Sequence, residues 1–286
     1  MKKIPLPNFD FDLSLNTCIQ GVGSAVQVGR YNANLFPCGA TETDYTTKAR
    51  QGDLFTFPST PHVRGQDPVV HGTLVKSELT KLYTDYFVPA DKPARALYEK
   101  LKVTANGKCP FCGGIGHVRT LDHYMPKANF PLFSVLPGNL VPCCRDCNTE
   151  KLNSFANTKG EQPLHPYYDN DKYFNEQWVF ADVIETDPPS LHFYAAPPVG
   201  WAADEQERVQ THFREYGLGE KFGTEAAADL PESIQTRRTT LRNATPDEFS
   251  DYLMEKSATL DFPTNNWRRV MFASLSASAW FCSNPF

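Results

Sequence analysis

The sequence predicts a fold of the α+β class. Its centre is a short strand–strand–helix motif that is stabilised by a bound metal ion and lies between flanking segments. Two Cys-x-x-Cys pairs bracket this motif, and four thiolates at such spacing are typical of a structural zinc site. Between the pairs, residues 117–124 and 139–142 have the composition of strands, and residues 148–155 have a helical pattern after the second pair. The flanks contain further helical patterns, and the segment after the motif also contains strand patterns.

The composition is that of a folded globular protein. The chain has 286 residues, 41% of them hydrophobic and 13% aromatic, which is enough for one large domain or two modest ones. No stretch approaches the roughly 20 apolar residues of a membrane helix, and the start, MKKIPLPNFDFD, has prolines and acids where a secretory signal has an apolar run. We therefore expect a cytoplasmic protein with no membrane partner, whose eight cysteines bind metal or are buried rather than forming disulfides.

The formal net charge of −5 is unevenly distributed along the chain. Residues 108–160 carry six basic and three acidic side chains, whereas residues 161–286 carry ten basic and twenty acidic ones. The positive excess around the cysteines suits a ligand that bears phosphate, although so small an excess is equally compatible with ordinary solvated charge. The acidity of the last part suggests a contact with a basic protein partner or another subunit, or a cover for the basic segment before activation.

The region before the motif, residues 1–104, is expected to be a mixture of loops and helices. Residues 1–70 are rich in Gly, Pro, Thr and Asn with short apolar runs, which predicts loops and a few strands. Residues 74–88 place apolar side chains at helical spacing, and residues 91–103 have a second, shorter helical pattern. The motif itself is assigned to residues 105–160.

The region after the motif, residues 161–286, is expected to be an acidic α+β segment. Residues 177–185 and 190–196 are rich in β-branched and aromatic side chains and are separated by an Asp-Pro-Pro turn signal, which predicts a pair of strands. Helical patterns follow over residues 204–219, 245–256 and 265–282.

The cysteine pairs are the strongest signal in the sequence. Cys109 and Cys112 form the first pair, and Cys144 and Cys147 form the second. Each Cys-x-x-Cys turn offers two thiolates to one metal ion, so together they predict a tetrahedral structural zinc site. Cys143 leaves an ambiguity in the second pair, because it could replace Cys144 at a three-residue spacing, but the regular turn favours Cys144. Since four thiolates leave no open coordination position, this zinc would stabilise the fold and would not activate water.

Between the two pairs, the first strand pattern ends in an Asp-His dipeptide, and an Asn directly follows the last cysteine. A strand that ends in Asp-His, a second strand and a helix are the arrangement of the HNH, or ββα-metal, endonucleases, and the sequence resembles that family over residues 105–160. It is similar in particular to the zinc-stapled branch, in which two Cys-x-x-Cys knuckles bracket the Asp-His pair. The matching residues are Cys109, Cys112, Asp122, His123, Asn139, Cys144, Cys147, Asn148 and Lys151.

The resemblance implies a metal-dependent nuclease that hydrolyses phosphodiester bonds in DNA, with RNA as an alternative substrate. His123 would take the proton from the attacking water, since a neutral imidazole is a suitable base near pH 7. Asp122 and Asn148 would supply oxygen ligands to a hard cation, Mg²⁺ or Mn²⁺, that stabilises charge at the phosphate. Asn139 matches the middle Asn of the family, whose side chain holds the hairpin and orients the base.

Four further residues are weaker candidates. Lys127, Arg119 and Lys151 are expected to contact phosphate, although Lys151 could equally be a solvated charge on the helix. His165 follows the motif and could supply an extra metal ligand or a phosphate donor, although such a histidine is more often structural.

A function of a different class is also compatible with the cysteines. A catalytically silent zinc module that binds nucleic acid or protein would keep the four cysteines but would have no use for Asp122 beside His123. The resemblance makes bacterial defence against phage, by a restriction-like effector, a reasonable setting, although no residue of the sequence indicates it.

Overall fold

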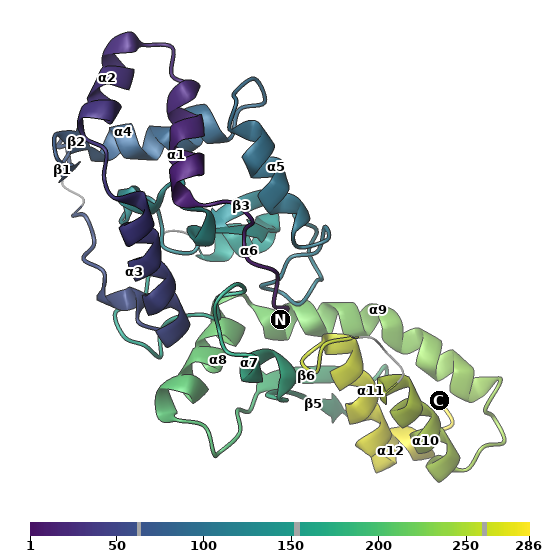
Figure 1. The fold of residues 1–286 in the computed structure, drawn as a ribbon. Coiled ribbons are helices and arrows are strands. Elements are labelled where there is room, and N and C mark those ends of the chain that lie inside the picture. Colours follow the sequence, from purple (N-terminus) through teal and green to yellow (C-terminus); the bar gives the residue numbers. More distant parts are fainter. Residues whose placement is uncertain (62–63, 152–154, 259–261) are drawn as a thin grey trace. The chain divides into compact units, whose positions relative to one another are not determined.

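The structure is a computed structural model that describes residues 1–61, 64–151, 155–258 and 262–286. The chain divides into two compact units. The N-terminal unit comprises Lys3–Pro110 and Gly116–Asp169, and the C-terminal unit comprises Met1–Lys2, Phe111–Ile115 and Asn170–Phe286. Both units combine helices with small two-stranded sheets, so the predicted α+β class is confirmed (Figure 1). No helix in these four ranges is long and apolar enough to span a bilayer.

Three helices dominate the first part of the N-terminal unit: α1 (Phe11–Gln20), α2 (Ala25–Ala33) and α3 (Cys38–Gln51). The prediction of loops and a few strands over residues 1–70 is therefore wrong. The helices begin at local caps: the side chain of Asp10 accepts a hydrogen bond from the Leu13 amide, and that of Ser24 accepts one from the Gln27 amide. Polar residues that suggested loops are thus helix starts or lie on exposed helix faces.

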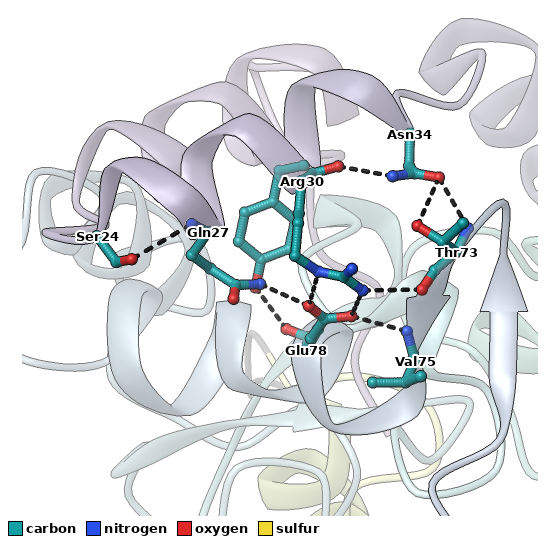
Figure 2. Close-up of polar contacts among 8 residues, drawn as sticks. Ser24, Gln27, Arg30, Asn34, Thr73, Val75 and Glu78 are labelled. Carbon is teal, nitrogen blue, oxygen red and sulfur yellow. Dashed lines mark hydrogen bonds and ion pairs between the residues drawn. The ribbon is translucent and has the colours of Figure 1, made fainter.

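A polar network fastens α2 to the segment that contains β1 (Val69–His71), β2 (Leu74–Val75) and α4 (Lys76–Lys81). Arg30 of α2 forms an ion pair with Glu78 of α4 at 2.7 Å and also donates a hydrogen bond to the carbonyl of Thr73 (Figure 2). Gln27 donates to the same carboxylate, which also accepts from the Val75 amide. The hydrogen bond from Arg30 is the main cause that lowers the pKa of Glu78 to about 2, so this carboxylate is charged near neutral pH.

The helical pattern over residues 74–88 is confirmed over most of its length, because α4 continues into the wider turn η2 (Leu82–Phe87). The second pattern corresponds to α5 (Arg95–Val103), which buries Leu97 and Leu101. Three short 3₁₀ turns complete the unit: η1 (Leu54–Thr56), η3 (Pro131–Phe133) and η4 (Pro137–Asn139).

The predicted strand–strand–helix order follows α5. β3 (Thr120–His123) pairs antiparallel with β4 (Leu140–Cys143), and α6 (Arg145–Lys151) comes directly after β4. Helix α5 packs against both strands. The helix predicted over residues 148–155 thus begins earlier, and its residues 152–154 lie outside the described residues.

The helices of the C-terminal unit are α7 (Lys172–Asn175), α8 (Ala203–Glu215), α9 (Leu218–Arg238), α10 (Pro246–Ala258), α11 (Trp267–Ala277) and α12 (Ala279–Ser283). Three of the helical patterns are therefore confirmed, with the last one divided at Ser278 into α11 and α12. Helix α9 was not predicted from the sequence. Its sequence contains Gly219, Gly223 and Pro231, which are residues that usually interrupt a helical pattern.

The predicted pair of strands is confirmed in the same unit. β5 (Val179–Ile184) pairs antiparallel with β6 (Ser190–Ala195) along its whole length, α9 packs against β6, and α11 packs against β5 (Figure 1). A Cβ atom at Gly219 would lie 3.3 Å from the carbonyl oxygen of Phe193, so the glycine lets α9 approach the strand closely. The Asn265 side chain accepts hydrogen bonds from the amides of Trp178 and Val179 and so fixes the start of β5.

Candidate functional site

The four predicted cysteine ligands come together in space. The sulfur atoms of Cys109, Cys112, Cys144 and Cys147 all lie within 4.8 Å of one another, and all four side chains are buried. Thiolates that bind one zinc ion tetrahedrally at about 2.3 Å lie roughly 4 Å apart, so the cluster has the size that a zinc ion requires. Within the described ranges, it is the one group of three or more His, Cys, Asp or Glu side chains that could hold a metal ion.

Cys143 lies beside this cluster without belonging to it. It is the last residue of β4 and is fully buried. Hydrogen bonding to Cys109, together with burial, raises the pKa of the Cys143 thiol far above its usual range. The amide of Cys147 donates to the sulfur of Cys144 at 3.4 Å, a contact within the second Cys-x-x-Cys turn. The choice of Cys144 over Cys143 as the fourth ligand therefore agrees with the cluster.

The turn after the first cysteine pair depends on two glycines and on an aromatic residue. Gly113 and Gly114 have φ angles of 66° and 96°, which only glycine adopts without strain.

Phe111 stacks on Tyr216 of α8 with ring centroids 4.8 Å apart, and its carbonyl oxygen lies 2.9 Å from Nε2 of His212. Burial lowers the pKa of His212 to about 3, so the ring is neutral at pH 7. No role could be predicted for His212 from the sequence, because Phe111, its hydrogen-bond partner, lies 101 positions away.

Asp122, a predicted metal ligand, forms a buried ion pair with Lys151. The Nζ atom of Lys151 lies 3.0 Å from Oδ2 of Asp122 and also donates to the carbonyls of His123 and Tyr124 at 2.6 and 2.8 Å. Burial raises the pKa of Asp122, and the charge of Lys151 opposes that shift. These bonds fasten the end of α6 to the end of β3. Lys151 is thus a buried structural ammonium, and not the exposed phosphate contact that the sequence suggested.

His123, the predicted base, is held by its Nε2 atom. This atom lies 2.9 Å from the carbonyl oxygen of Ser134, and because a carbonyl can only accept, Nε2 carries the proton and Nδ1 carries the lone pair. The ring also packs edge-on against Tyr83, with centroids 4.3 Å apart. Burial lowers the pKa of His123 to about 3. The side chain is therefore a neutral imidazole whose orientation is fixed.

Asn139 closes the long connection between β3 and β4. Its Oδ1 atom accepts hydrogen bonds from the Tyr45 hydroxyl and the Met125 amide, and its Nδ2 atom donates to the carbonyls of Met125 and Phe133. The side chain is completely buried. These bonds hold both ends of the loop that carries Ser134, so Asn139 fixes the carbonyl that receives the histidine ring.

Three other predicted site residues, Asn148, Lys127 and Arg119, differ in burial and in their contacts. Asn148 is half-buried on α6, three residues before Lys151. Lys127 places its ammonium 5.4 Å from the centre of the Tyr83 ring, and partial burial lowers its pKa. Arg119 is exposed, and its backbone amide donates to the carbonyl of Cys143.

His165 lies in an aromatic cluster, and its backbone amide donates to Oδ2 of Asp169 at 2.6 Å. Its ring stacks on Tyr124 with centroids 4.1 Å apart, and its Nδ1 atom accepts from the Tyr167 amide. The Nε2 atom lies 3.5 Å from the Tyr45 hydroxyl. The residue is almost fully buried, so these contacts support a structural role rather than an extra metal ligand.

The chain is similar along its whole length to a protein of Escherichia phage lambda, the ea31 protein. The two are 36% identical over 295 aligned positions, which cover 98% of this chain and 99% of the relative. No family model matches the chain, and no solved structure matches it. An identity of this size over nearly all of both sequences is the mark of common descent. The chain therefore belongs to the family of the ea31 protein of phage lambda.

Proposed function

We propose that the chain is a metal-dependent endonuclease of the HNH type that hydrolyses phosphodiester bonds in DNA. The observation that carries the proposal is the set of hydrogen bonds by which Lys151 fastens α6 to the end of β3. Asn148 lies three residues before Lys151, and residues at this spacing share one face of a helix. The side chain of Asn148 is therefore expected on the face of α6 that Lys151 joins to the end of β3, where Asp122 lies.

The donor atoms suit a hard divalent cation. Asp122 and Asn148 offer a carboxylate and an amide oxygen, which are ligands that Mg²⁺ and Mn²⁺ prefer. Lys151 contacts Oδ2 of Asp122 at 3.0 Å, and the other carboxylate oxygen would be the one to bind the ion. One or two protein oxygens with several waters are typical of Mg²⁺ sites. When bound, such an ion would polarise the phosphate and stabilise the leaving oxygen.

In this proposal His123 is the general base, because its ring is neutral at pH 7 and is fixed by one contact. Its neutral ring donates from Nε2 to the carbonyl of Ser134, so Nδ1 is the atom that takes a proton from water. As this proton leaves, the water oxygen bonds to phosphorus and the bond from phosphorus to the sugar oxygen breaks. Asn139 holds the loop that carries Ser134 and acts through it as a positioning residue.

Nicking of supercoiled plasmid by the zinc-loaded protein tests this proposal. We expect the wild type to nick in the presence of Mg²⁺ or Mn²⁺, and His123→Ala to be slower by about 10²–10⁴, the usual contribution of a general base. His212→Gln is the matched control, because it also removes a buried neutral histidine but one that contacts Phe111 rather than the hairpin. Equal nicking by wild type and His123→Ala would contradict the proposal.

A silent zinc module is the second candidate, and one observation favours it. Asp122 and His123 already have protein partners in Lys151 and Ser134, and both side chains are buried. In such a module, Asp122→Ala protein that remains folded by circular dichroism would show unchanged nucleic-acid binding and no change in cutting, whereas Cys112→Ala would abolish binding. Loss of cutting in Asp122→Ala with binding retained would exclude it. The setting of bacterial defence against phage stays a prediction.

A further inference from the structure

Four exposed basic side chains lie around the zinc-knuckle hairpin, and we refer to them together as the knuckle edge: Lys108, His117, Arg119 and Arg145. Lys108 and His117 face each other in an antiparallel bridge. Arg119 follows His117 by two residues, which places both side chains on one face of an extended strand. The Arg119 amide donates to the carbonyl of Cys143 at 2.9 Å, so this strand runs beside the end of β4, two residues before Arg145. Backbone pairing thus brings the four residues to neighbouring positions.

Among the described residues, the basic side chains of the knuckle edge lack acidic partners, unlike some other basic residues of the N-terminal unit. Arg30 pairs with Glu78, and Lys151 pairs with Asp122. Lys108, Arg119 and Arg145 form no ion pair with any of the described residues. Residues 106–127 contain a single acid, Asp122, whose carboxylate is buried against Lys151. The exposed acid next to the knuckle edge in the chain is Asp146, so positive charge remains in excess.

The spacing along the chain limits how far the knuckle edge can lie from the predicted base, His123. A strand rises about 3.3 Å per residue, so Arg119 lies up to about 13 Å and His117 up to about 20 Å from His123 along the chain. The phosphates of one DNA strand follow one another at about 3.4 Å along the helix axis. The knuckle edge can therefore reach phosphates up to about four to six base pairs from a bond placed at His123. Lys127, which contacts the Tyr83 ring beside His123, would serve the nearer phosphates.

We propose that the knuckle edge binds the sugar–phosphate backbone of duplex DNA on one side of the cut. The inference rests on the proposed function, which supplies the position of the cut. Arg119 and Arg145 can each hold two phosphate oxygens through a planar guanidinium group, while Lys108 acts as a point charge. Contacts of this kind fix the position of the duplex without reading its sequence, and they weaken steeply as salt is added.

The test compares two double variants in a His123→Ala background, in which the full-length protein should bind DNA without cutting it. Arg119→Ala/Arg145→Ala removes two charges from the knuckle edge. Arg50→Ala/Lys81→Ala removes two exposed charges from α3 and α4 of the same unit and is the control. Fluorescence anisotropy with a labelled DNA duplex, repeated over a range of KCl concentrations, gives the dissociation constant and its salt dependence. Zinc content and the circular dichroism spectrum establish that all variants fold alike.

We expect the knuckle-edge variant to bind at least tenfold more weakly than its parent and the control to change less than twofold. The slope of log K against log salt should flatten by about two, since each lost phosphate contact removes about 0.9. Equal binding and equal slopes in the two double variants would overturn the inference even if the wild type cuts DNA. Conversely, loss of binding in the knuckle-edge variant, with a wild type that cuts no substrate, would support duplex binding by the knuckle edge but would overturn the proposed function and, with it, the placement beside a cut. Tighter binding of an RNA duplex than of DNA would overturn DNA as the ligand.

Discussion

The ammonium of Lys151 lies 3.0 Å from the carboxylate of Asp122, and these two side chains are only 3% and 9% exposed. The same ammonium donates to two carbonyls at the end of β3, so three acceptors surround its three donors. A buried pair of opposite charges is tolerated only when its hydrogen bonds are satisfied in this way, and removal of one partner leaves an uncompensated charge. The stability of the hairpin and the properties of the candidate site therefore depend on the same contact.

The first prediction concerns this pair. Lys151→Met should lower the free energy of unfolding by about 3–5 kcal/mol, because the Asp122 carboxylate is left buried without a counter-ion. Urea denaturation of the zinc-loaded protein at pH 7 measures the change. Lys81→Met, at an exposed position of α4, is the control and should stay within about 0.5 kcal/mol of the wild type.

A double variant separates the charge from the packing. Lys151→Met/Asp122→Asn should be more stable than Lys151→Met alone, because asparagine is neutral and costs less to bury. If the single variant lost less than about 1 kcal/mol, or if the double variant were no more stable, the ion pair would not be the contact that holds α6 to β3.

The second prediction contrasts the two asparagines of the candidate site. Asn139→Ala removes four buried hydrogen bonds and should cost at least about 2 kcal/mol of stability. Asn148 is half-buried, and Asn148→Ala should cost no more than about 0.5 kcal/mol. Thermal or urea unfolding distinguishes the two. Under the proposed function, Asn148→Ala should nevertheless abolish most of the metal-dependent nicking, and a stable Asn148→Ala protein with full activity would exclude it as a ligand.

The strand–strand–helix motif could be predicted because it depends on short sequence patterns. The Cys-x-x-Cys spacing fixes which sulfur atoms can meet, and the cluster of Cys109, Cys112, Cys144 and Cys147 follows from it. Strand patterns around Asp122 and after Asn139 were also sufficient for β3 and β4. The first three helices escaped prediction, since short polar helices depend on caps such as Asp10 and on tertiary packing rather than on periodicity.

The partners of the site residues could not be read from the sequence. Ser134 lies in a loop, and only the folded connection brings its carbonyl to His123. Tyr45 reaches Asn139 across 94 positions. The basic character of Lys151 was visible, but its burial against Asp122 reverses the role that its charge suggested. Long-range contacts of this kind are set by packing, which a single sequence does not encode in any short pattern.

The third prediction concerns the metal. Cys144→Ser should reduce the bound zinc well below one equivalent and destabilise the protein, because a tetrahedral thiolate site loses a ligand. Cys143→Ser should retain one equivalent, since Cys143 is outside the cluster. Elemental analysis after gel filtration measures the zinc in both. Retention of zinc in Cys144→Ser with its loss in Cys143→Ser would mean that the two adjacent cysteines had been assigned the wrong way round.

The fourth prediction concerns pH and His212. Burial lowers the pKa of this histidine to about 3 in the folded chain, whereas an unfolded histidine titrates near 6.5. Below about pH 6.5 the unfolded chain therefore binds a proton that the folded chain does not, so stability is complete above this pH and falls as the pH decreases toward 3. Each pH unit in this window costs about 1.4 kcal/mol for one such group.

His212→Gln isolates this contribution, because glutamine does not titrate and its amide can still donate to the carbonyl of Phe111. Between pH 7 and pH 5 the wild type should lose about 2 kcal/mol more stability than His212→Gln, measured by urea denaturation in zinc-containing buffer. Protonation of the thiolates and of His123 lowers the stability of both proteins alike and cancels in the comparison. Parallel stability curves would show that His212 gains a proton in the folded chain as easily as in the unfolded one, and hence that the contact with Phe111 opens in solution.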